Sequence, residues 1–226
     1  MKSKFIFSLA LMLVIYAQSF AQDERRTYVG LKGGYNSSGV NWFHSFYRGY
    51  DIPQDIQNGY TGGIIVMNFL RNNIGIQGEL NYSQKGYIQR FENAEDYSEQ
   101  FNYVELPFLF NLHTGKEKFH LFFNAGCFFE YLISVETSDA DFDNILEEEK
   151  FFPYDPDRDP NFGYGFRGGV GSFYDSRIGT FMLEASFSYS LSNHIDPPSF
   201  DSGEPTLSNH MVVGVTLGYL VSFGTF

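Results

Sequence analysis

Cysteine is almost absent from this sequence, because its 226 residues include only one. A single cysteine excludes an intramolecular disulfide framework and a zinc site built from several cysteines. Basic residues are scarce too: 15 Lys and Arg stand against 27 Asp and Glu, which gives a net charge of −12. This balance argues against nucleic acid as a partner, since a nucleic-acid binder needs a basic surface to meet phosphate.

Long apolar runs are absent beyond the first residues. The one marked run, 5–16, follows two lysines and precedes the small residues Ser19 and Ala21, which is the layout of a secretory signal peptide. Its twelve residues are too few for a membrane-spanning helix, which needs about 20. We therefore expect a signal peptide at 1–21 and one mature domain at 22–226 that does not cross a membrane as helices.

The mature sequence instead contains many segments in which large apolar residues alternate with small or polar ones. In 181–191, for example, Leu183 and Phe187 alternate with Glu184 and Ser186. Eight segments follow this pattern: 28–36, 61–69, 74–83, 103–112, 119–131, 162–171, 181–191 and 211–223. A period of two is typical of β-strands, and lengths of about ten residues match strands that cross a bilayer. Strands of ordinary globular proteins are shorter, about five or six residues.

The connections between these segments alternate strictly between short and long. The short ones fall at 71–73, 113–118 and 175–177, and the long ones at 40–58, 85–100, 136–160 and 193–208. An up-and-down barrel places alternate connections at opposite ends, and outer-membrane barrels have short periplasmic turns and long external loops. We therefore predict an all-β fold, an eight-stranded antiparallel up-and-down transmembrane β-barrel. It would lie in the outer membrane, with both mature termini on the periplasmic side.

Alternation alone does not tell which face of the strands points outward. A soluble lipocalin-like barrel that binds a ligand would bury the large residues, and it stands as the alternative fold. Glycines favour the membrane barrel, because Gly163, Gly165, Gly169 and Gly171 share one face and strand glycines usually mark close packing. Inside a narrow barrel they would make room for charged side chains, while the apolar face meets lipid.

Five motifs carry a resemblance to a known family. They are Gly30–Gly34, Gln77–Gly86, Tyr103–Pro107, Gly126–Ser134 and Leu217–Leu220. In this order they resemble the PorT-like outer-membrane β-barrel proteins typical of the Bacteroidota, which are related in shape to the small OmpX and OmpA barrels. The resemblance implies an integral outer-membrane barrel. Most members of that family have no assigned activity, and the link of one member to protein secretion is not transferred to this chain.

The resemblance also implies two partners, outer-membrane lipid and the barrel-assembly machinery. That machinery reads a final aromatic residue, which here is either the terminal Phe226 or Phe223. Phe223 has the same outward parity as Tyr219 and Val221.

Several ionisable residues fall on the inward face of the predicted strands. They are Lys32, Glu79, Arg167 and Glu184 at similar depth, Glu105 close by, and Glu130 nearer the outer mouth. Charges in so narrow a lumen must pair, because burying an isolated ion costs several kcal/mol. We predict a structural network of ion pairs that fills the lumen; the alternative is a path for protons or ions. Four glutamates against two cations suggest that one carboxyl stays protonated.

The predicted loop 136–160 holds ten acidic and two basic residues. Asp139, Asp141 and Asp143 have the every-other spacing of a calcium-binding loop, but Lys150 occupies the position where a bidentate glutamate belongs. We expect a solvated acidic loop and no metal, with these three aspartates as the candidates for divalent-cation binding.

Aromatic residues crowd the first long connection, at Trp42, Phe43, Phe46, Tyr47 and Tyr50. We expect them at the barrel rim or the membrane interface; the alternative is a patch that binds a protein partner.

Catalytic motifs are missing. His194 with Asp196, and His44 with Asp51, lie close in sequence, but no nucleophile motif accompanies them. We therefore predict no catalytic residues and no cofactor, and a structural, interaction or transport-accessory role. A small outer-membrane hydrolase or acyltransferase and a narrow pore are the alternatives.

Overall fold

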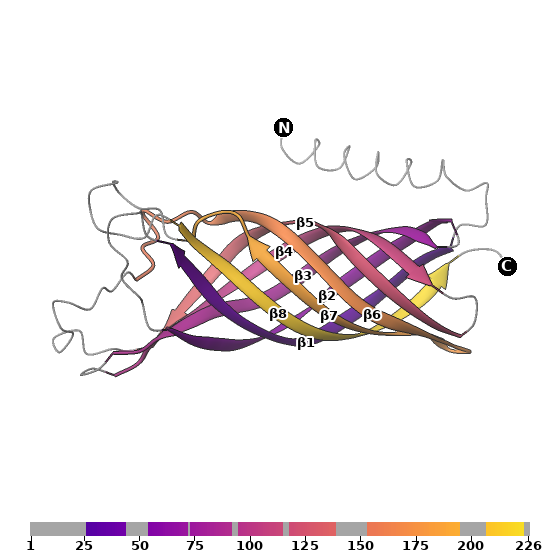
Figure 1. Ribbon diagram of the computed structural model, residues 1–226, viewed down its shortest axis with the longest axis horizontal. Coiled ribbons are helices and arrows are strands. Elements are labelled where there is room, and N and C mark those ends of the chain that lie inside the picture. The colour runs from indigo at the N-terminus through magenta and orange to yellow at the C-terminus, as the bar shows by residue number, and fades with distance from the viewer. Residues whose placement is uncertain are drawn as a thin grey trace, which may run out of the picture.

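The computed structural model describes residues 26–43, 54–71, 73–91, 95–114, 118–138, 153–194 and 207–223. These residues form a closed antiparallel barrel in which consecutive strands pair and β8 pairs with β1 (Figure 1). The strands are β1 (Arg26–Phe43), β2 (Gln54–Arg71), β3 (Ile74–Gln89), β4 (Tyr97–Thr114), β5 (Phe119–Thr137), β6 (Phe162–Ser176), β7 (Gly179–Ser190) and β8 (Leu207–Phe223). The predicted fold class is confirmed. Among the described residues there is no helix long and apolar enough to cross a bilayer.

The two ends of the barrel differ in their connections. Residues 72–73, 115–118 and 177–178 join strands at one end, which we call the turn end, and β1 begins and β8 ends there. The opposite end, the loop end, carries the connections 44–53, 90–96, 138–161 and 191–206. The strands reach further toward the loop end than the sequence predicted, since much of the predicted loop 85–100 belongs to β3 and β4.

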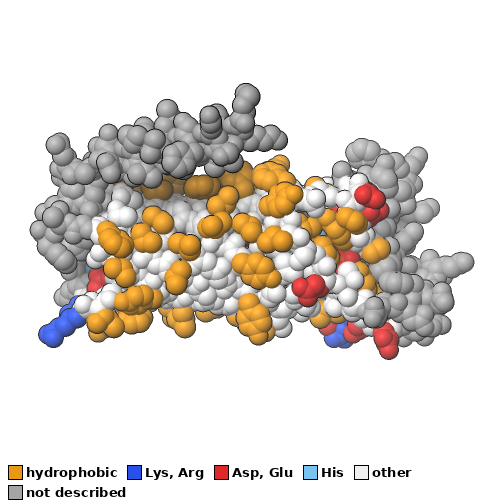
Figure 2. All heavy atoms as spheres, turned by 180° about the vertical axis from the view of Figure 1, so that it is seen from behind, with side chains coloured by type: hydrophobic (Ala, Val, Ile, Leu, Met, Phe, Trp, Pro, Cys, Tyr) orange, Lys and Arg blue, Asp and Glu red, His pale blue; other side chains and the backbone are white. Residues whose placement is uncertain are grey.

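Apolar side chains cover the outside of the barrel and polar side chains fill its middle. Leu31 and Phe110 expose 67% and 68% of their surface, whereas their neighbours Lys32 and Asn111 expose 5% and 0%. Figure 2 shows hydrophobic side chains spread over the wall, with charged ones toward its two ends. The predicted orientation, with the large apolar residues outward, is the one observed.

Strand glycines make room inside the lumen, and not for charged groups alone. A Cβ atom on Gly171 would lie 2.2 Å from the carbonyl oxygen of Leu183 and 2.5 Å from the ring of Phe122. At Gly163 a Cβ atom would lie 2.7 Å from the carboxylate of Glu130. Glycine therefore admits both an aromatic ring and an ionised group close to the wall.

The lumen is filled by apolar side chains at both ends. At the turn end they form a cluster that we call the floor: Ile65, Met67, Phe122, Phe173, Met182 and Leu220. Phe122 and Phe173 stack there with ring centroids 4.3 Å apart. At the loop end a second cluster, the cap, contains Val40, Tyr87, Phe101, Tyr103 and Leu132. Polar and charged residues occupy the space between the floor and the cap.

The wall is uneven at the loop end. Exposed outward-facing tyrosines lie on five strands in the loop-end half of the wall: Tyr35, Tyr60, Tyr82, Tyr131 and Tyr164. Beyond its tyrosine, β1 continues for eight residues, β3 for seven and β5 for six. β6 has only two residues beyond its tyrosine, and β7 ends at Ser190, opposite Gly165. The barrel wall therefore has a notch above β6 and β7.

Candidate functional site

The charged residues between floor and cap form two groups of contacts. In the first, nearer the floor, the Lys32 ammonium lies 2.6 Å from a Glu79 carboxylate oxygen and 3.2 Å from one of Glu184. Amide side chains complete the shells of the two carboxylates: Asn81 donates to Glu79 and Asn124 donates to Glu184, both at 2.7 Å.

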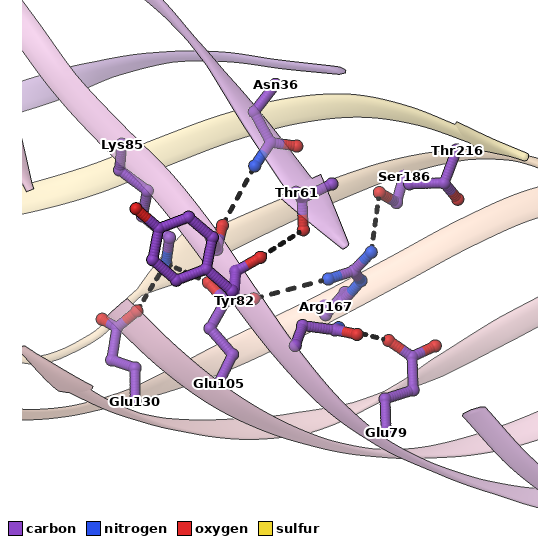
Figure 3. A network of polar contacts seen from close by, with 12 residues as sticks. Asn36, Thr61, Glu79, Tyr82, Lys85, Glu105, Glu130, Arg167, Ser186 and Thr216 are labelled. Atoms are coloured by element: carbon purple, nitrogen blue, oxygen red, sulfur yellow. Dashed lines mark hydrogen bonds and ion pairs between the residues drawn. The ribbon is translucent and has the colours of Figure 1, made fainter. Parts of the chain in front are cut away.

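The second group, nearer the cap, is centred on Lys85. Its ammonium lies 2.5 Å from Glu105 and also contacts Glu130 (Figure 3). Arg167 approaches Glu105 at 3.7 Å and donates to the Ser186 hydroxyl at 3.1 Å. The side chains of Lys85, Glu105 and Arg167 are almost fully buried, so these ions are compensated by one another rather than by water.

All six residues that the sequence placed in the lumen lie buried inside the barrel. Lys85 also lies buried in the lumen, although the sequence predicts a loop from this residue onward. Its parity was the available signal, since it lies two residues beyond the inward Ser83 on the same face of β3. The expected count of two cations was therefore wrong: between the floor and the cap, the described residues place three cations beside four glutamates, and a fifth buried glutamate, Glu99, lies in the cap. The protonated carboxyl stays a prediction, now for an excess of one negative charge instead of two.

The buried carboxylate of Glu99 binds the loop segment 153–161 to the cap. Glu99, on the inward face of β4, is fully buried and accepts hydrogen bonds from the hydroxyls of Tyr97 (2.6 Å) and Tyr87 (2.9 Å). It also accepts one from the backbone N–H of Tyr154 at 2.9 Å. The ring of Tyr154 packs edge-on against Phe101, with ring centroids 5.8 Å apart. These contacts hold the segment 153–161 over the mouth of the barrel.

Next to this segment, below the notch, lies a small pocket. Its lining comes from five strands or their ends and includes Tyr103, Glu130, Phe162, Ser190, Ser192, His194 and His210. The rings of His194 and His210 lie 4.7 Å apart, centroid to centroid. Burial lowers the pKa of His194, which lies beyond the end of β7, to about 4. The imidazole of His194 is therefore neutral at pH 7.

The sequence did not find this pocket. It paired His194 with Asp196, which lies outside the described residues, and it passed over His210 entirely. His210 has the inward parity of β8, but nothing in a single sequence shows that β8 and the residues after β7 converge on β4 and β5.

The pocket brings serines, histidines and a glutamate together without joining them as a catalytic set. The Ser190 hydroxyl donates to Glu130 at 2.9 Å, and the Ser192 hydroxyl accepts from the backbone N–H of Tyr164 at 3.1 Å. Within the described residues no imidazole nitrogen is hydrogen-bonded to a serine hydroxyl, so no serine there has a histidine base in place.

The structure describes residues 153–160 of the predicted acidic loop. Asp155 and Asp159 close a tight turn, in which the Asp155 carbonyl oxygen accepts from the Asp159 N–H at 2.8 Å and Arg158 pairs with Asp159 at 2.7 Å. In the ranges the structure describes, no three or more His, Cys, Asp or Glu side chains are grouped so as to hold a metal ion.

Several predictions fall outside the described residues, and their structural outcome is not tested. They are the signal peptide, the candidates Asp139, Asp141 and Asp143, the aromatic residues Phe46, Tyr47 and Tyr50, the pair His44 and Asp51, and the terminal Phe226.

The family described as Outer membrane protein beta-barrel domain matches residues 16–196, which is most of the chain. The chain belongs to this family. It is therefore an outer-membrane β-barrel protein, and its outward apolar side chains face lipid. No curated protein matches the sequence. The narrower PorT-like assignment stays a prediction.

Three solved structures are similar to this chain. Ail, the attachment invasion locus protein of Yersinia pestis, is 14% identical with a TM-score of 0.40, and the match covers 86% of this chain and 98% of Ail. OprG from Pseudomonas aeruginosa is 12% identical with a TM-score of 0.43, covering 91% and 98%. Neisserial surface protein A is 11% identical with a TM-score of 0.42, covering 87% and 97%.

Proposed function

We propose that this barrel is a closed, non-catalytic anchor that holds a structured rim outside the cell, where the rim and its loops contact a partner protein. In this proposal the loop end faces the exterior and both mature termini face the periplasm. The PorT-like resemblance fits such a role, as does insertion by the barrel-assembly machinery, but neither identifies the partner.

The observation that carries the proposal is the wall beyond the outward tyrosines. Tyrosines gather at membrane–water interfaces, so the strand ends beyond them are expected to stand in water. On β3, β4 and β5 polar side chains are bonded to one another there: the Tyr82 hydroxyl donates to Asn102 at 2.8 Å, and Asn102 donates to Ser134 and Glu136, both at 3.0 Å. Exposed apolar side chains remain among the strand ends, at Ile56, Ile133 and Phe162. A wall that is hydrogen-bonded outside on these three strands and closed inside by the cap suits a rigid surface for binding.

The filled lumen argues against a pore. The floor, the ion pairs and the cap occupy successive levels of the barrel, and ions would have to cross the apolar floor without water or ligands to replace their hydration. The pocket beside the cap argues against a hydrolase in the state described, because its serines are bonded to groups other than its histidines.

Labelling of intact cells tests the orientation on which this proposal depends. In a Cys127→Ala background, Asp157→Cys places one thiol on the segment 153–161, and Arg177→Cys places one at the turn end. We expect a membrane-impermeant maleimide to label position 157 on intact cells and position 177 only after the outer membrane is opened. Labelling of position 177 alone on intact cells would show that the turn end faces the exterior, which would contradict the proposal.

A further inference from the structure

Two buried histidines of the pocket have ring nitrogens without hydrogen-bond partners. His194 exposes 5% of its surface and His210 exposes 2%. Nε2 of His194 and both ring nitrogens of His210 have no partner among the described residues. A buried polar group without a partner costs about 1–3 kcal/mol, so three such nitrogens in one place call for a missing ligand.

The two rings are held in place by their surroundings. The backbone N–H of His194 donates to the carbonyl oxygen of Ser208 at 2.8 Å. Its ring packs edge-on against Phe101, with centroids 4.1 Å apart, and lies nearly parallel to the ring of Tyr154, with centroids 5.9 Å apart. The ring of His210 also packs against Phe101, at 5.5 Å. A ligand would therefore meet a preformed pair of imidazoles.

The size of the pocket limits what the ligand can be. Its enclosed part has room for about one water-sized species, which excludes a sugar or a lipid headgroup without rearrangement. Single atoms that bind neutral imidazole nitrogens are divalent ions of the later transition metals.

The ring separation also fits a shared metal ion. With metal–nitrogen bonds of about 2.0–2.1 Å, two imidazoles bound at angles of about 90–110° have ring centroids about 4.5–5.2 Å apart. The observed separation is 4.7 Å. The two nearby cations are each paired with acidic groups, which offsets part of their repulsion of a metal ion: Lys85 is paired with Glu105 and Glu130, and Arg158 is paired with Asp159.

We propose that His194 and His210 form a binding site for one divalent transition-metal ion of the Zn²⁺, Cu²⁺ or Ni²⁺ type. The two imidazoles are its protein ligands, and water supplies the rest, because Glu130 is already bound to Lys85 and Ser190. The site joins the residues after β7 to β8 at the notch, so the ion would link chain segments where the wall is shortest. This inference does not depend on whether the barrel conducts.

Metal titration of the purified, chelator-treated barrel in detergent tests the site. We expect Cu²⁺ and Zn²⁺ each to saturate at one ion per chain, and Zn²⁺ to raise the unfolding temperature as a ligand of the folded state does. His194→Gln and His210→Gln should each weaken binding by at least about tenfold, and the double variant by at least about a hundredfold. The matched control, His113→Gln with His120→Gln at the turn end, should keep the wild-type affinity.

A spectroscopic measurement on the wild-type protein covers the case in which a variant fails to fold. Electron paramagnetic resonance of the Cu²⁺ complex should show couplings to two imidazole nitrogens. Absence of binding, binding that survives in a folded double variant, or a signal from oxygen ligands alone would overturn the proposal. In each of these cases the pocket would hold only ordered water.

Discussion

At the scale of single residues, Lys85 has the most demanding position in the lumen. Its buried ammonium forms ion pairs with both Glu105 and Glu130. It also lies over the rings of Tyr103 and Phe128, 5.1 and 5.0 Å from their centroids. Neither carboxylate has another cation closer than Arg167, which lies 3.7 Å from Glu105.

Replacing this lysine should therefore cost more than an ordinary ion pair. We expect Lys85→Met to lower the free energy of unfolding by about 3–5 kcal/mol, because it leaves two buried carboxylates with little compensation. Urea unfolding in lipid vesicles measures the change. Lys118→Met, at an exposed site at the turn end, is the control and should leave the unfolding midpoint within error. Equal urea-unfolding midpoints for the two variants would show that Lys85 does not stabilise the ion-pair network.

His194 predicts how stability depends on pH. Its pKa in the folded protein is about 4, below the value of about 6.5 for an unfolded chain, because burial disfavours the charged ring. As the pH falls from about 6.5 toward 4, the His194 ring therefore binds a proton in the unfolded chain but stays neutral in the folded protein. The folded state loses stability over that pH range. Above pH 6.5 the ring is neutral in both states and contributes no such loss.

The comparison of wild type with His194→Gln in chelator-containing, metal-free buffer isolates this effect. The difference in unfolding free energy should change by a few kcal/mol between pH 7 and pH 4, in the direction that favours the variant at low pH. His210, Asp159, Arg158 and Tyr154 face or adjoin the same ring and are present in both proteins, so the difference chiefly reports the loss of the His194 ring. A difference that stays constant with pH would mean that the ring is solvated.

At the scale of elements, the sequence predicted the strands well within the apolar band and poorly beyond it. Within the band, outward residues are large and apolar, and inward ones are small or polar except where they form the floor, so the period of two is plain in segments such as 181–191. Past the tyrosines this contrast is lost. On β3 the outward Gln84 is polar, whereas the inward Tyr87 is aromatic and packs in the cap. The strand continues because its backbone is paired with β4, which a single sequence does not show.

The same reason explains which site residues were found. Inward parity located Lys32, Glu79 and Glu184 in the apolar band, where the pattern is strong. Lys85 and His210 lie at the weakly patterned loop end. The pocket there lies below the notch, which exists because β6 and β7 end early. No sequence motif marks where these strands end.

The segment 153–161 provides a test at this scale. We expect Glu99→Leu to release it, because the Tyr154 N–H and two tyrosine hydroxyls lose their shared acceptor. Limited trypsin digestion of the folded barrel, followed by mass spectrometry, should show cleavage after Arg158 about tenfold faster than in wild type, since proteolysis follows local opening. Glu136→Leu, on the exposed outward face of β5, is the matched control. An unchanged cleavage rate in Glu99→Leu would show that other contacts hold the segment.

At the scale of the whole molecule, the barrel wall separates lipid from a lumen that side chains fill at every level described. Apolar residues form the floor and much of the cap, while compensated ions occupy the middle. This order is suited to a membrane anchor: the charges of the middle are paired with one another away from lipid, and the apolar floor closes the end at which β1 begins and β8 ends.

Planar-bilayer recording of the purified wild-type barrel tests this closure most directly. We predict insertion without steady conductance at either polarity, with insertion verified by the gel mobility shift of the folded, unheated protein. A large-pore barrel inserted under the same conditions provides the positive control. A stable ohmic current that scales with the number of inserted barrels would contradict a filled lumen.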